Sequence, residues 1–440
     1  MHWAVMHYST GGTTQLLGIP HARGPKVAPP STWPRHAAIR SAPSLPDFVV
    51  RQLSGGRPLE SRWVPAGLAA GALLAGVGWW LARRRAAART APRARRRAWR
   101  WRVFALGTAC AVLLVLATLA AVNSYVGYVP TLAALLDRLP SANDTARRPA
   151  LALPRGARPG GVHLDEAGRF GSRIVKVTID AAGLGFRHRP AYVYLPPGYG
   201  LPANANHRYP VVYLIHGNPG GAIDWMRAGA VGTAMDTLLA DHLLRPMIVV
   251  APSGSWSWTA DSECLNTVGR QKAETYLTRV VVAWVDNHFR TIANRANRAV
   301  GGMSSGAYCA LNLGLRHQDE FSVMLAHEPY GTPGLAAERS LLGGSAALYR
   351  ANSPLEYLPT MRFHRRLAVF LDAGSDDHEA LGQARQLAVE LADRGQVVAL
   401  RIAAGTGHTW REARLELPYS LIFADQHFRG GSALTAQPSS

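Results

Sequence analysis

Two long stretches without a charged residue, 64–82 and 103–122, constrain the fold of this 440-residue chain most strongly. At about 1.5 Å of rise per helical residue, each stretch approaches the roughly 30 Å thickness of the hydrocarbon core of a membrane. We therefore expect two membrane-spanning helices. A buried helix of a soluble protein is the alternative for the first stretch. Against it, Gly67 and Gly71 have the small-xxx-small spacing found where membrane helices pack together.

Aromatic residues mark both ends of the second stretch. Trp99 and Trp101 lie at its start, and Tyr125 and Tyr128 follow its end. Trp and Tyr are enriched where a membrane meets water, because their rings are largely apolar and also carry a polar group. We expect these four residues to anchor the second helix at the two interfaces.

The basic residues are concentrated between the two apolar stretches. The chain has 48 Lys and Arg residues and a formal net charge of +20. Short Arg-rich loops stay in the cytoplasm, because carrying many guanidinium groups across a membrane is unfavourable. We therefore expect a cytoplasmic loop over 83–102, with both ends of a multi-pass cell-membrane protein outside. A loop held between membrane helices is poorly placed to bind nucleic acid, so we expect no nucleic-acid partner. The arginines of this segment are Arg83, Arg84, Arg85, Arg89, Arg93, Arg95, Arg96, Arg97, Arg100 and Arg102.

Three further regions lack the pattern of a folded domain. Residues 1–62 have scattered Pro, Gly, Ser, Arg and His without periodicity, which predicts a disordered segment. Residues 124–172 are expected to form a short juxtamembrane helix within "YVPTLAALLDRLP", followed by a linker rich in Pro, Gly and Arg. Residues 430–440 are expected to form a disordered tail.

Strand-like and helical segments alternate between residues 173 and 429. The expected strands are "RIVKVTI", "AYVYLP", "VVYLIH", "MIVVAP", "RAVGG", "FSVMLAH", "LAVFLDA" and "VVALRIA". The expected helices include "AETYLTRVVVAWVDNHF", "SGAYCALNLGLRH", "EALGQARQLAVELADR" and "REARLELPYSLIFADQHF". This alternation predicts one α/β domain with a mainly parallel sheet, which places its chemistry at the carboxyl ends of the strands.

A pair of serines lies between glycines in "AVGGMSSGAYCAL". The pattern G-x-S-x-G fits Gly302, Ser304 and Gly306, whereas centring it on Ser305 would put Met and Ala where glycines belong. A strand precedes the motif and a helix follows it, as in the turn that exposes a nucleophilic serine. Ser304 is therefore the candidate nucleophile, and a Gly-Ser turn without a special role is the alternative.

A serine nucleophile needs a base and an acid that orients the base. His408 follows the last expected strand in a Gly-bounded loop and precedes the last helix, so we expect it to be the base. For the acid, Asp376 and Asp377 both follow the strand "LAVFLDA", while Asp372 lies at its end and can instead stabilise a turn. Other histidines lack this combination of order and placement: His317, His327, His364, His378 and His427.

The segment "HGNPGG" after the strand "VVYLIH" is expected to supply one donor to an oxyanion. Pro219 has no N–H, so Asn218 is the better donor, paired with the backbone N–H of Ser305. A Gly-rich phosphate cradle is the competing interpretation, but no Walker lysine follows.

Three cysteines occur in the chain. Cys110 lies inside the second apolar stretch, whereas Cys264 and Cys309 fall in the domain expected outside the cell. An oxidising exterior favours a disulfide between Cys264 and Cys309 over two unpaired buried thiols.

Several of these segments together resemble the putative-esterase family of α/β-hydrolases, which includes esterase D, feruloyl esterases and mycolyltransferases. They are "PVVYLIHGNPGGAIDW", "ETYLTRVVVAWVDNHF", "AVGGMSSGAYCALNLGLRHQDEFS", "FLDAGSDD" and "GTGHTWREARLELP", in family order over about 250 residues. The spans and the segment "AAVNSYVGYVPTL" resemble membrane-anchored actinobacterial members.

The resemblance implies an α/β-hydrolase fold and carries the nucleophile onto Ser304, the base onto His408 and the acid onto Asp377. Ser305 and Ala307 replace the Met and Gly of many members, which puts the substrate in doubt more than the triad. By the same analogy, tryptophans line an acyl or acceptor site, although ordinary packing explains them as well: Trp225, Trp256, Trp258 and Trp410.

These observations lead us to expect an extracytoplasmic serine esterase or acyltransferase. Its partners would be an ester substrate, such as an envelope lipid or glycan ester, and the membrane. No metal-ligand spacing appears, and the chemistry needs no cofactor. The alternative is a non-catalytic envelope protein that keeps the fold as a binding or anchoring module. The sequence makes no prediction about the oligomeric state.

Overall fold

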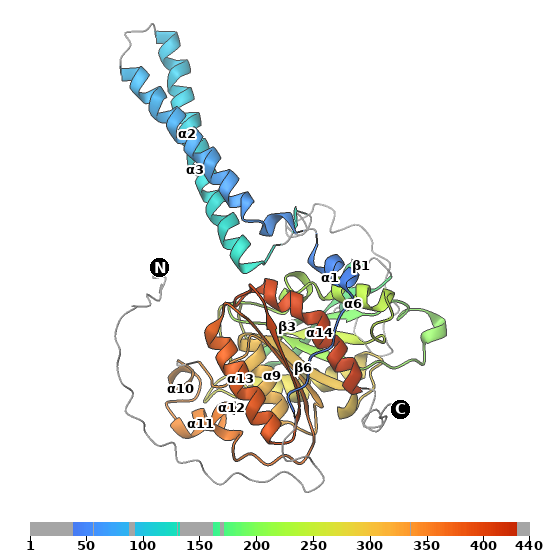
Figure 1. Ribbon diagram of the computed structural model, residues 1–440. Coiled ribbons are helices and arrows are strands. Elements are labelled where there is room, and N and C mark those ends of the chain that lie inside the picture. The colour runs from blue at the N-terminus through green and yellow to red at the C-terminus, as the bar shows by residue number, and fades with distance from the viewer. Residues whose placement is uncertain are drawn as a thin grey trace.

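The molecule consists of a long helical hairpin that projects from an α/β domain (Figure 1). The hairpin is formed by α2 (Trp63–Ala87) and α3 (Arg93–Val126), and the C-terminal end of α2 and the N-terminal end of α3 lie far from the domain. The computed structural model describes residues 38–55, 57–87, 93–129, 131–132, 162–167, 171–334 and 336–428.

The two hairpin helices extend beyond the expected spans. We expected a loop over 83–102, but α2 continues to Ala87 and α3 begins at Arg93, so most of the Arg-rich segment is helical. Arg and Ala are both good helix formers, which explains the extension. Small residues bring the helices close: a Cβ on Gly71 would lie 3.5 Å from Leu113, whereas one on Gly67 would meet nothing within 4 Å.

A nine-stranded sheet forms the centre of the domain, in the order β1-β2-β3-β5-β4-β6-β7-β8-β9. Strands β4 to β9 pair in parallel, while β1, β2 and β3 join them through antiparallel pairs. The eight expected strands correspond to β2–β9, so the prediction of an α/β-hydrolase fold with a mostly parallel sheet is confirmed. The strands are β1 (Val162–Ala167), β2 (Arg173–Ala181), β3 (Phe186–Leu195), β4 (Val211–Ile215), β5 (Ile248–Pro252), β6 (Arg298–Met303), β7 (Val323–His327), β8 (Ala368–Gly374) and β9 (Val397–Ala403).

Helices cover both faces of the sheet. One face carries α1, α6 and α14, and the other carries α9, α13 and the helical segment from α7 to α8. The central strands β4, β5 and β7 are buried at every position, which accounts for their continuous apolar sequences. The helices are α1 (Asp47–Ser54), α6 (Val231–Ala240), α7 (Ala273–Thr275), a π-helical segment (Tyr276–Val281), α8 (Val282–His288), α9 (Ser305–Arg316), α13 (His378–Asp393) and α14 (Trp410–Phe428). Shorter helices are Pro58–Glu60, Ala182–Leu184, Pro202–Asn204, α5 (Asp224–Arg227), Arg295–Asn297, α10 (Ala337–Ser340), α11 (Ala346–Ala351) and α12 (Pro354–Tyr357).

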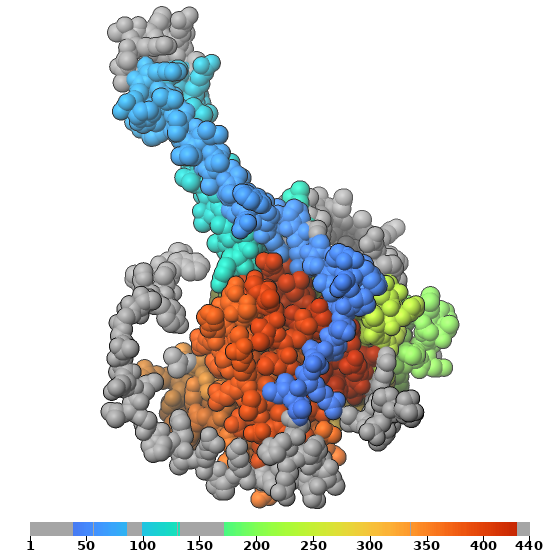
Figure 2. All heavy atoms as spheres, in the orientation of Figure 1, coloured from blue at the N-terminus to red at the C-terminus, as the bar shows by residue number. Residues whose placement is uncertain are grey.

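Two segments that we expected to lie outside the domain belong to it. The prediction that all of 1–62 is disordered is wrong for α1, because Val49 is completely buried and Leu53, one turn later, packs against the same cluster. Figure 2 shows this part of the chain, in blue, lying over the C-terminal part of the domain. The expected linker 124–172 likewise contains β1, which pairs with β2. Residues 1–37, residues 133–140 of the juxtamembrane helix expected in "YVPTLAALLDRLP" and the tail 430–440 lie outside the described residues.

The strand order brings distant parts of the chain to one edge of the sheet. Strands β4, β6, β7, β8 and β9 are consecutive neighbours and run in parallel, so the residues that follow each of them share the carboxyl edge. In this fold class that edge is where ligands bind.

Candidate active site

Ser304 occupies a sharp turn between β6 and α9. Its backbone has φ 59° and ψ −121°, a conformation that non-glycine residues rarely adopt and that is often found at functional sites. No side chain fits at the two flanking glycines. A Cβ on Gly302 would lie 2.2 Å from the carbonyl oxygen of Gly306, and one on Gly306 would lie 2.1 Å from that of Ile215. The backbone N–H of Ser304 donates to the carbonyl of His327 at 2.9 Å, which ties the turn to β7.

Ser305 is buried, and its side chain is already bonded within the protein. Its hydroxyl donates to Asp261 Oδ1 at 2.8 Å. Because Ser305 is the first residue of α9, its backbone N–H has no acceptor within the helix. The two adjacent serines therefore differ: Ser304 lies at the strained turn, while Ser305 presents a backbone donor beside it.

His408 and Asp377 lie in the loops that follow β9 and β8, and a hydrogen bond joins them. His408 Nδ1 lies 2.8 Å from Asp377 Oδ2. The other carboxylate oxygen, Oδ1, accepts from the backbone N–H of Ala380 at 3.0 Å in the first turn of α13. This leaves His408 Nε2 as the ring nitrogen available to a nucleophile. Among the described residues, no hydrogen bond joins Ser304 Oγ to His408, and such contacts are often long in the free state of an enzyme.

The other two candidate acids have different partners. Asp376 Oδ1 accepts from the hydroxyl of Ser375 at 2.9 Å. Asp372 is completely buried, and its Oδ2 lies 2.7 Å from Nδ1 of His327. The structure therefore brings only Asp377, of the three, within hydrogen-bond distance of His408.

The environment of this pair favours a charged histidine. Burial opposes the charge on His408, but its hydrogen bond with Asp377 and the nearby Glu328 outweigh that effect and raise the pKa of His408 above its ordinary value. The hydrogen bond with His408 lowers the pKa of Asp377, which keeps that carboxylate ionised. A base that becomes protonated during the reaction is stabilised by this arrangement.

Glu328 is a buried acid at this site that the sequence analysis missed. It follows β7 directly, has φ 54°, and accepts from the backbone N–H of Gly374 at 3.0 Å. Its Oε2 lies 4.0 Å from His408 Nδ1. Burial raises the pKa of Glu328 to about 7. Its position at the carboxyl end of a fully buried strand, in "LAHEPY", is the signal that would have identified it.

Glu328, Asp377 and His408 each offer one ligand atom, and these atoms lie within 4.8 Å of one another. His408 Nδ1 lies 2.8 Å from Asp377 Oδ2 and 4.0 Å from Glu328 Oε2, so a cation held through this nitrogen would compete with the acid–base pair.

The loop with Asn218 lies beside the nucleophile turn. A Cβ on Gly217 would be 3.4 Å from the Cβ of Ser304. His216 supports this loop: its Nδ1 contacts the carbonyl of Gly217 at 2.8 Å, and its Nε2 accepts from the N–H of Gly254 at 3.1 Å. Burial lowers the pKa of His216, so this histidine is neutral with its proton on Nδ1. Asn218 is an exposed residue, and within the described part of the chain its backbone N–H has no hydrogen-bond acceptor.

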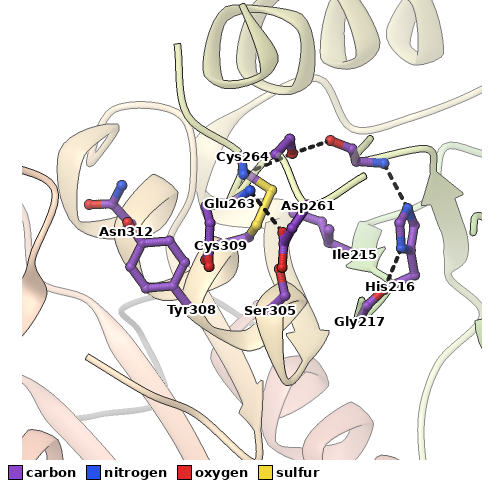
Figure 3. Close-up of a disulfide and its surroundings, with 12 residues drawn as sticks. Ile215, His216, Gly217, Asp261, Glu263, Cys264, Ser305, Tyr308, Cys309 and Asn312 are labelled. Carbon is purple, nitrogen blue, oxygen red and sulfur yellow. Dashed lines mark hydrogen bonds between the residues drawn. A yellow bond between two sulfur atoms is a disulfide. The ribbon is translucent and has the colours of Figure 1, made fainter. Parts of the chain in front are cut away.

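A disulfide bond joins Cys264 and Cys309 close to the nucleophile turn (Figure 3). Cys309 belongs to α9, and Cys264 lies in the segment between β5 and α7, next to Glu263 and Asp261. The disulfide and the Ser305–Asp261 bond therefore attach the same segment to the start of α9. Cys110 in α3 is a free thiol.

The four tryptophans fall into two groups. Trp225 is buried and donates from Nε1 to the carbonyl of Ile215 at 2.8 Å, and its ring packs edge-on against Trp410 at 5.2 Å. These two residues belong to the core and do not line an open site. Trp256 packs against a small cluster around Leu265, whereas Trp258 is 60% exposed.

His378 is exposed at the start of α13, and three other histidines have structural partners away from Ser304. His317 pairs with Glu274 at 2.9 Å, and His364 pairs with Asp319 at 3.1 Å on the surface. Nδ1 of His427 contacts the carbonyl of Phe423 at 2.8 Å within α14.

Comparisons with known proteins agree with this fold. Residues 186–422 match the family described as "Putative esterase", which is more than half of the chain. An uncharacterized protein of Corynebacterium glutamicum is 26% identical over 249 residues, covering 54% of this chain and 58% of that protein. An esterase of Mycobacterium tuberculosis is 28% identical over 219 residues, 45% of each chain. The chain thus spans only about half the length of these relatives.

A solved structure shares the architecture of the domain. A ferulic acid esterase superposes with a TM-score of 0.51 at 26% identity, covering 58% of this chain and 99% of that one. Together with the match over residues 186–422, this similarity shows that the chain belongs to the putative-esterase family and has an α/β-hydrolase fold.

Proposed function

We propose that this protein is a membrane-anchored, extracytoplasmic serine esterase or acyltransferase, with Ser304 as nucleophile, His408 as base and Asp377 as the acid that orients it. The observation that carries the proposal is the 2.8 Å contact between His408 Nδ1 and Asp377 Oδ2, at the sheet edge that also carries the Ser304 turn. The esterase relatives and the ferulic acid esterase neighbour support an ester as the substrate.

The chemistry proceeds in two halves. Ser304 Oγ bonds to the ester carbonyl carbon as its proton passes to His408 Nε2, and the backbone N–H groups of Asn218 and Ser305 donate to the developing oxyanion. The bond to the leaving alcohol then breaks, and that alcohol takes the proton from His408. Water or an acceptor alcohol attacks the acyl-enzyme in the same way, which gives hydrolysis or transfer.

The membrane anchor is supported by the surface of the hairpin. Large apolar side chains on α2 and α3 are exposed, among them Leu73, Leu74, Val115 and Leu119, each above 55%. The core helix of a soluble protein would bury these side chains, because exposing them to water is unfavourable. The Arg-rich end of the hairpin lies opposite the domain (Figure 1), and because Arg-rich segments stay in the cytoplasm, this arrangement supports an extracytoplasmic domain.

A fluorophosphonate probe tests the catalytic half of the proposal. We expect covalent labelling of the wild type and of Ser305→Ala, and loss of labelling in Ser304→Ala. A folded wild-type protein that is not labelled would support the non-catalytic binding module instead.

Two further measurements test location and outcome. A reporter that is active only in the cytoplasm should be inactive when fused after residue 440; activity there would refute the extracytoplasmic placement. Product analysis with a chromogenic ester and added glycerol or sugar separates transfer from hydrolysis, because only transfer yields a new ester.

A further inference from the structure

The two residues directly after α3 connect the hairpin to the candidate oxyanion loop. Tyr128 donates from its hydroxyl to Asp224 Oδ1 at 2.5 Å. Asp224 is buried, and its other oxygen accepts from the backbone N–H of Gly221 at 2.8 Å. Gly221 lies in the same short loop as Asn218. One buried carboxylate therefore links the end of the second apolar helix to the loop that is proposed to bind the oxyanion.

A second contact links the hairpin to the helix that follows the candidate base. The carbonyl of Gly127 accepts from Arg414 Nη1 at 2.9 Å, and Arg414 is buried in α14. Gly127 has φ +66°, and a Cβ on it would lie 2.7 Å from the Cβ of Arg411. Since α14 begins at Trp410, two residues after His408, the end of α3 lies against the first turn after the catalytic loop.

The segment before α2 and the end of α3 also contact each other. Arg414 forms an ion pair with Glu60, which precedes α2. Asn123 donates from Nδ2 to the carbonyl of Leu59 at 3.0 Å, and its Oδ1 accepts from the backbone N–H of Val129 at 2.7 Å. The base of the hairpin is thus cross-linked by polar contacts and bound to the domain.

Aromatic residues indicate where the membrane surface would lie. Tyr125 and Trp63 are 69% and 72% exposed, and both lie at the end of the hairpin next to the domain. Such residues favour the interface between membrane and water. Tyr128 follows Tyr125 by three residues and lies beyond the end of α3, so the Cα atoms of the two residues are at most about 11 Å apart. The contacts to the oxyanion loop therefore lie close to the expected interface.

The exposed ring of Trp258 lies beside the same loop. The carbonyl of Trp258 accepts from the N–H of Gly220 at 2.9 Å, and its ring lies 3.7 Å from where a Cβ on Gly221 would be. A largely exposed tryptophan beside a site is a surface on which an acyl chain can lie.

We propose that residues 127 and 128 hold the opening of the catalytic site at the outer face of the cell membrane, and that the natural substrate is an ester of a membrane lipid. This inference rests on the proposed function and narrows its substrate class. A lipid ester would reach Ser304 from the plane of the bilayer, without first dissolving in water. A soluble glycan ester would gain nothing from this arrangement.

The test uses the full chain in phosphatidylcholine vesicles. A fluorogenic dioleoylglycerol ester is placed either in the same vesicles as the protein or in separate ones, and p-nitrophenyl butyrate reports on soluble substrate. We expect hydrolysis of the lipid ester to be at least about tenfold faster in the same vesicles, because confinement to one bilayer raises the effective concentration. Equal rates in both arrangements, or turnover of the butyrate ester without any turnover of the lipid ester, would overturn the inference.

Variants of Gly127 and Tyr128 test whether the contacts between the hairpin and the domain position the site for a lipid ester. Gly127→Ala should separate α3 from Arg411, and Tyr128→Phe removes the bond to Asp224 without adding bulk. For both we expect the lipid-ester rate to fall about tenfold, as for loss of a hydrogen bond to a charged group, while the butyrate rate and fluorophosphonate labelling are retained. Tyr125→Phe is the matched control and should leave both rates unchanged.

An equal fall in both rates would show that residues 127 and 128 support the fold alone, and would overturn the role in substrate presentation. Failure of labelling in the wild type would instead refute the proposed function.

Discussion

Removing the disulfide should weaken the domain by an amount that follows from its position in the chain. Cys264 and Cys309 are 45 residues apart, and the chain-entropy model for a loop of that size gives about 13 cal/mol/K, or about 4 kcal/mol near room temperature. The variant should carry both Cys264→Ala and Cys309→Ala, so that no single reactive thiol remains. We expect its free energy of unfolding to be about 4 kcal/mol lower than that of the wild type.

Urea unfolding of the full chain in detergent, followed by tryptophan fluorescence, measures this difference. Reduction of the wild type should reproduce the effect of the double variant, since both open the same loop. Cys110→Ala is the matched control, because this thiol lies in α3 away from the domain, and its effect should stay within about 0.5 kcal/mol. A double variant within about 1 kcal/mol of the wild type would refute the reasoning from loop length.

The same variant should also affect catalysis. The disulfide and the Ser305–Asp261 bond attach one segment to the start of α9, where the backbone N–H of Ser305 is the proposed oxyanion donor. Complete loss of such a donor costs about 3 kcal/mol, so partial loosening should lower kcat by about tenfold. An unchanged kcat at a temperature where the variant is folded would restrict the disulfide to a role in stability.

Other predictions concern individual acids. Asp377→Asn should lower kcat by about 10⁴-fold, because the base loses its orienting carboxylate, whereas Asp376→Asn should have little effect; equal losses would refute the assignment. The rate depends on a neutral His408, so kcat/KM should rise with pH through the raised pKa of that residue, above 6.5. Glu328→Gln removes the negative charge that Glu328 carries above its own pKa of about 7, so the pKa of His408 should fall and this rise should move to lower pH; an unmoved pH profile would show that Glu328 has no electrostatic effect on His408. Burial, with the nearby Asp261, raises the pKa of Glu263 to about 8, so wild-type stability should fall between about pH 4.5 and 8, where the unfolded chain loses this proton and the folded one keeps it. Glu263→Gln should therefore gain stability relative to the wild type over that range, and a constant difference in unfolding free energy between pH 5 and 8 would contradict this.

Local patterns in the sequence predicted the strands well. Strands β4 to β8 are short segments bounded by turn residues and are buried at every position, whereas β2, β3 and β9 are buried only in part and were recognised by their apolar positions. The strand β1 was missed because half of the residues in "VHLDEA" are polar, and the segment becomes a strand only by pairing with β2. Helix α1 was missed because its apolar contact consists of little more than Val49 and Leu53, and a site for it exists only on the folded domain.

For the candidate site, the sequence by itself determined the residue types and their order. The spacing of Gly302, Ser304 and Gly306 is a local steric requirement, so it can be read without a fold. The order of Ser304, an acid and His408 follows from the order of the strands that carry them. The choice of Asp377 over Asp376 could be narrowed by resemblance, but only the tertiary structure shows which carboxylate lies 2.8 Å from His408.

Glu328 and the contacts of residues 127 and 128 were decided by tertiary structure alone. Glu328 approaches His408 because β7, β8 and β9 are neighbours in the sheet, which no local pattern specifies. Tyr128 and Asp224 are 96 residues apart, and Arg414 meets Glu60 across 354 residues. Contacts between segments so distant depend on the packing of the whole chain, because hydrogen bonds form only between groups that the fold has already brought within about 3 Å of each other.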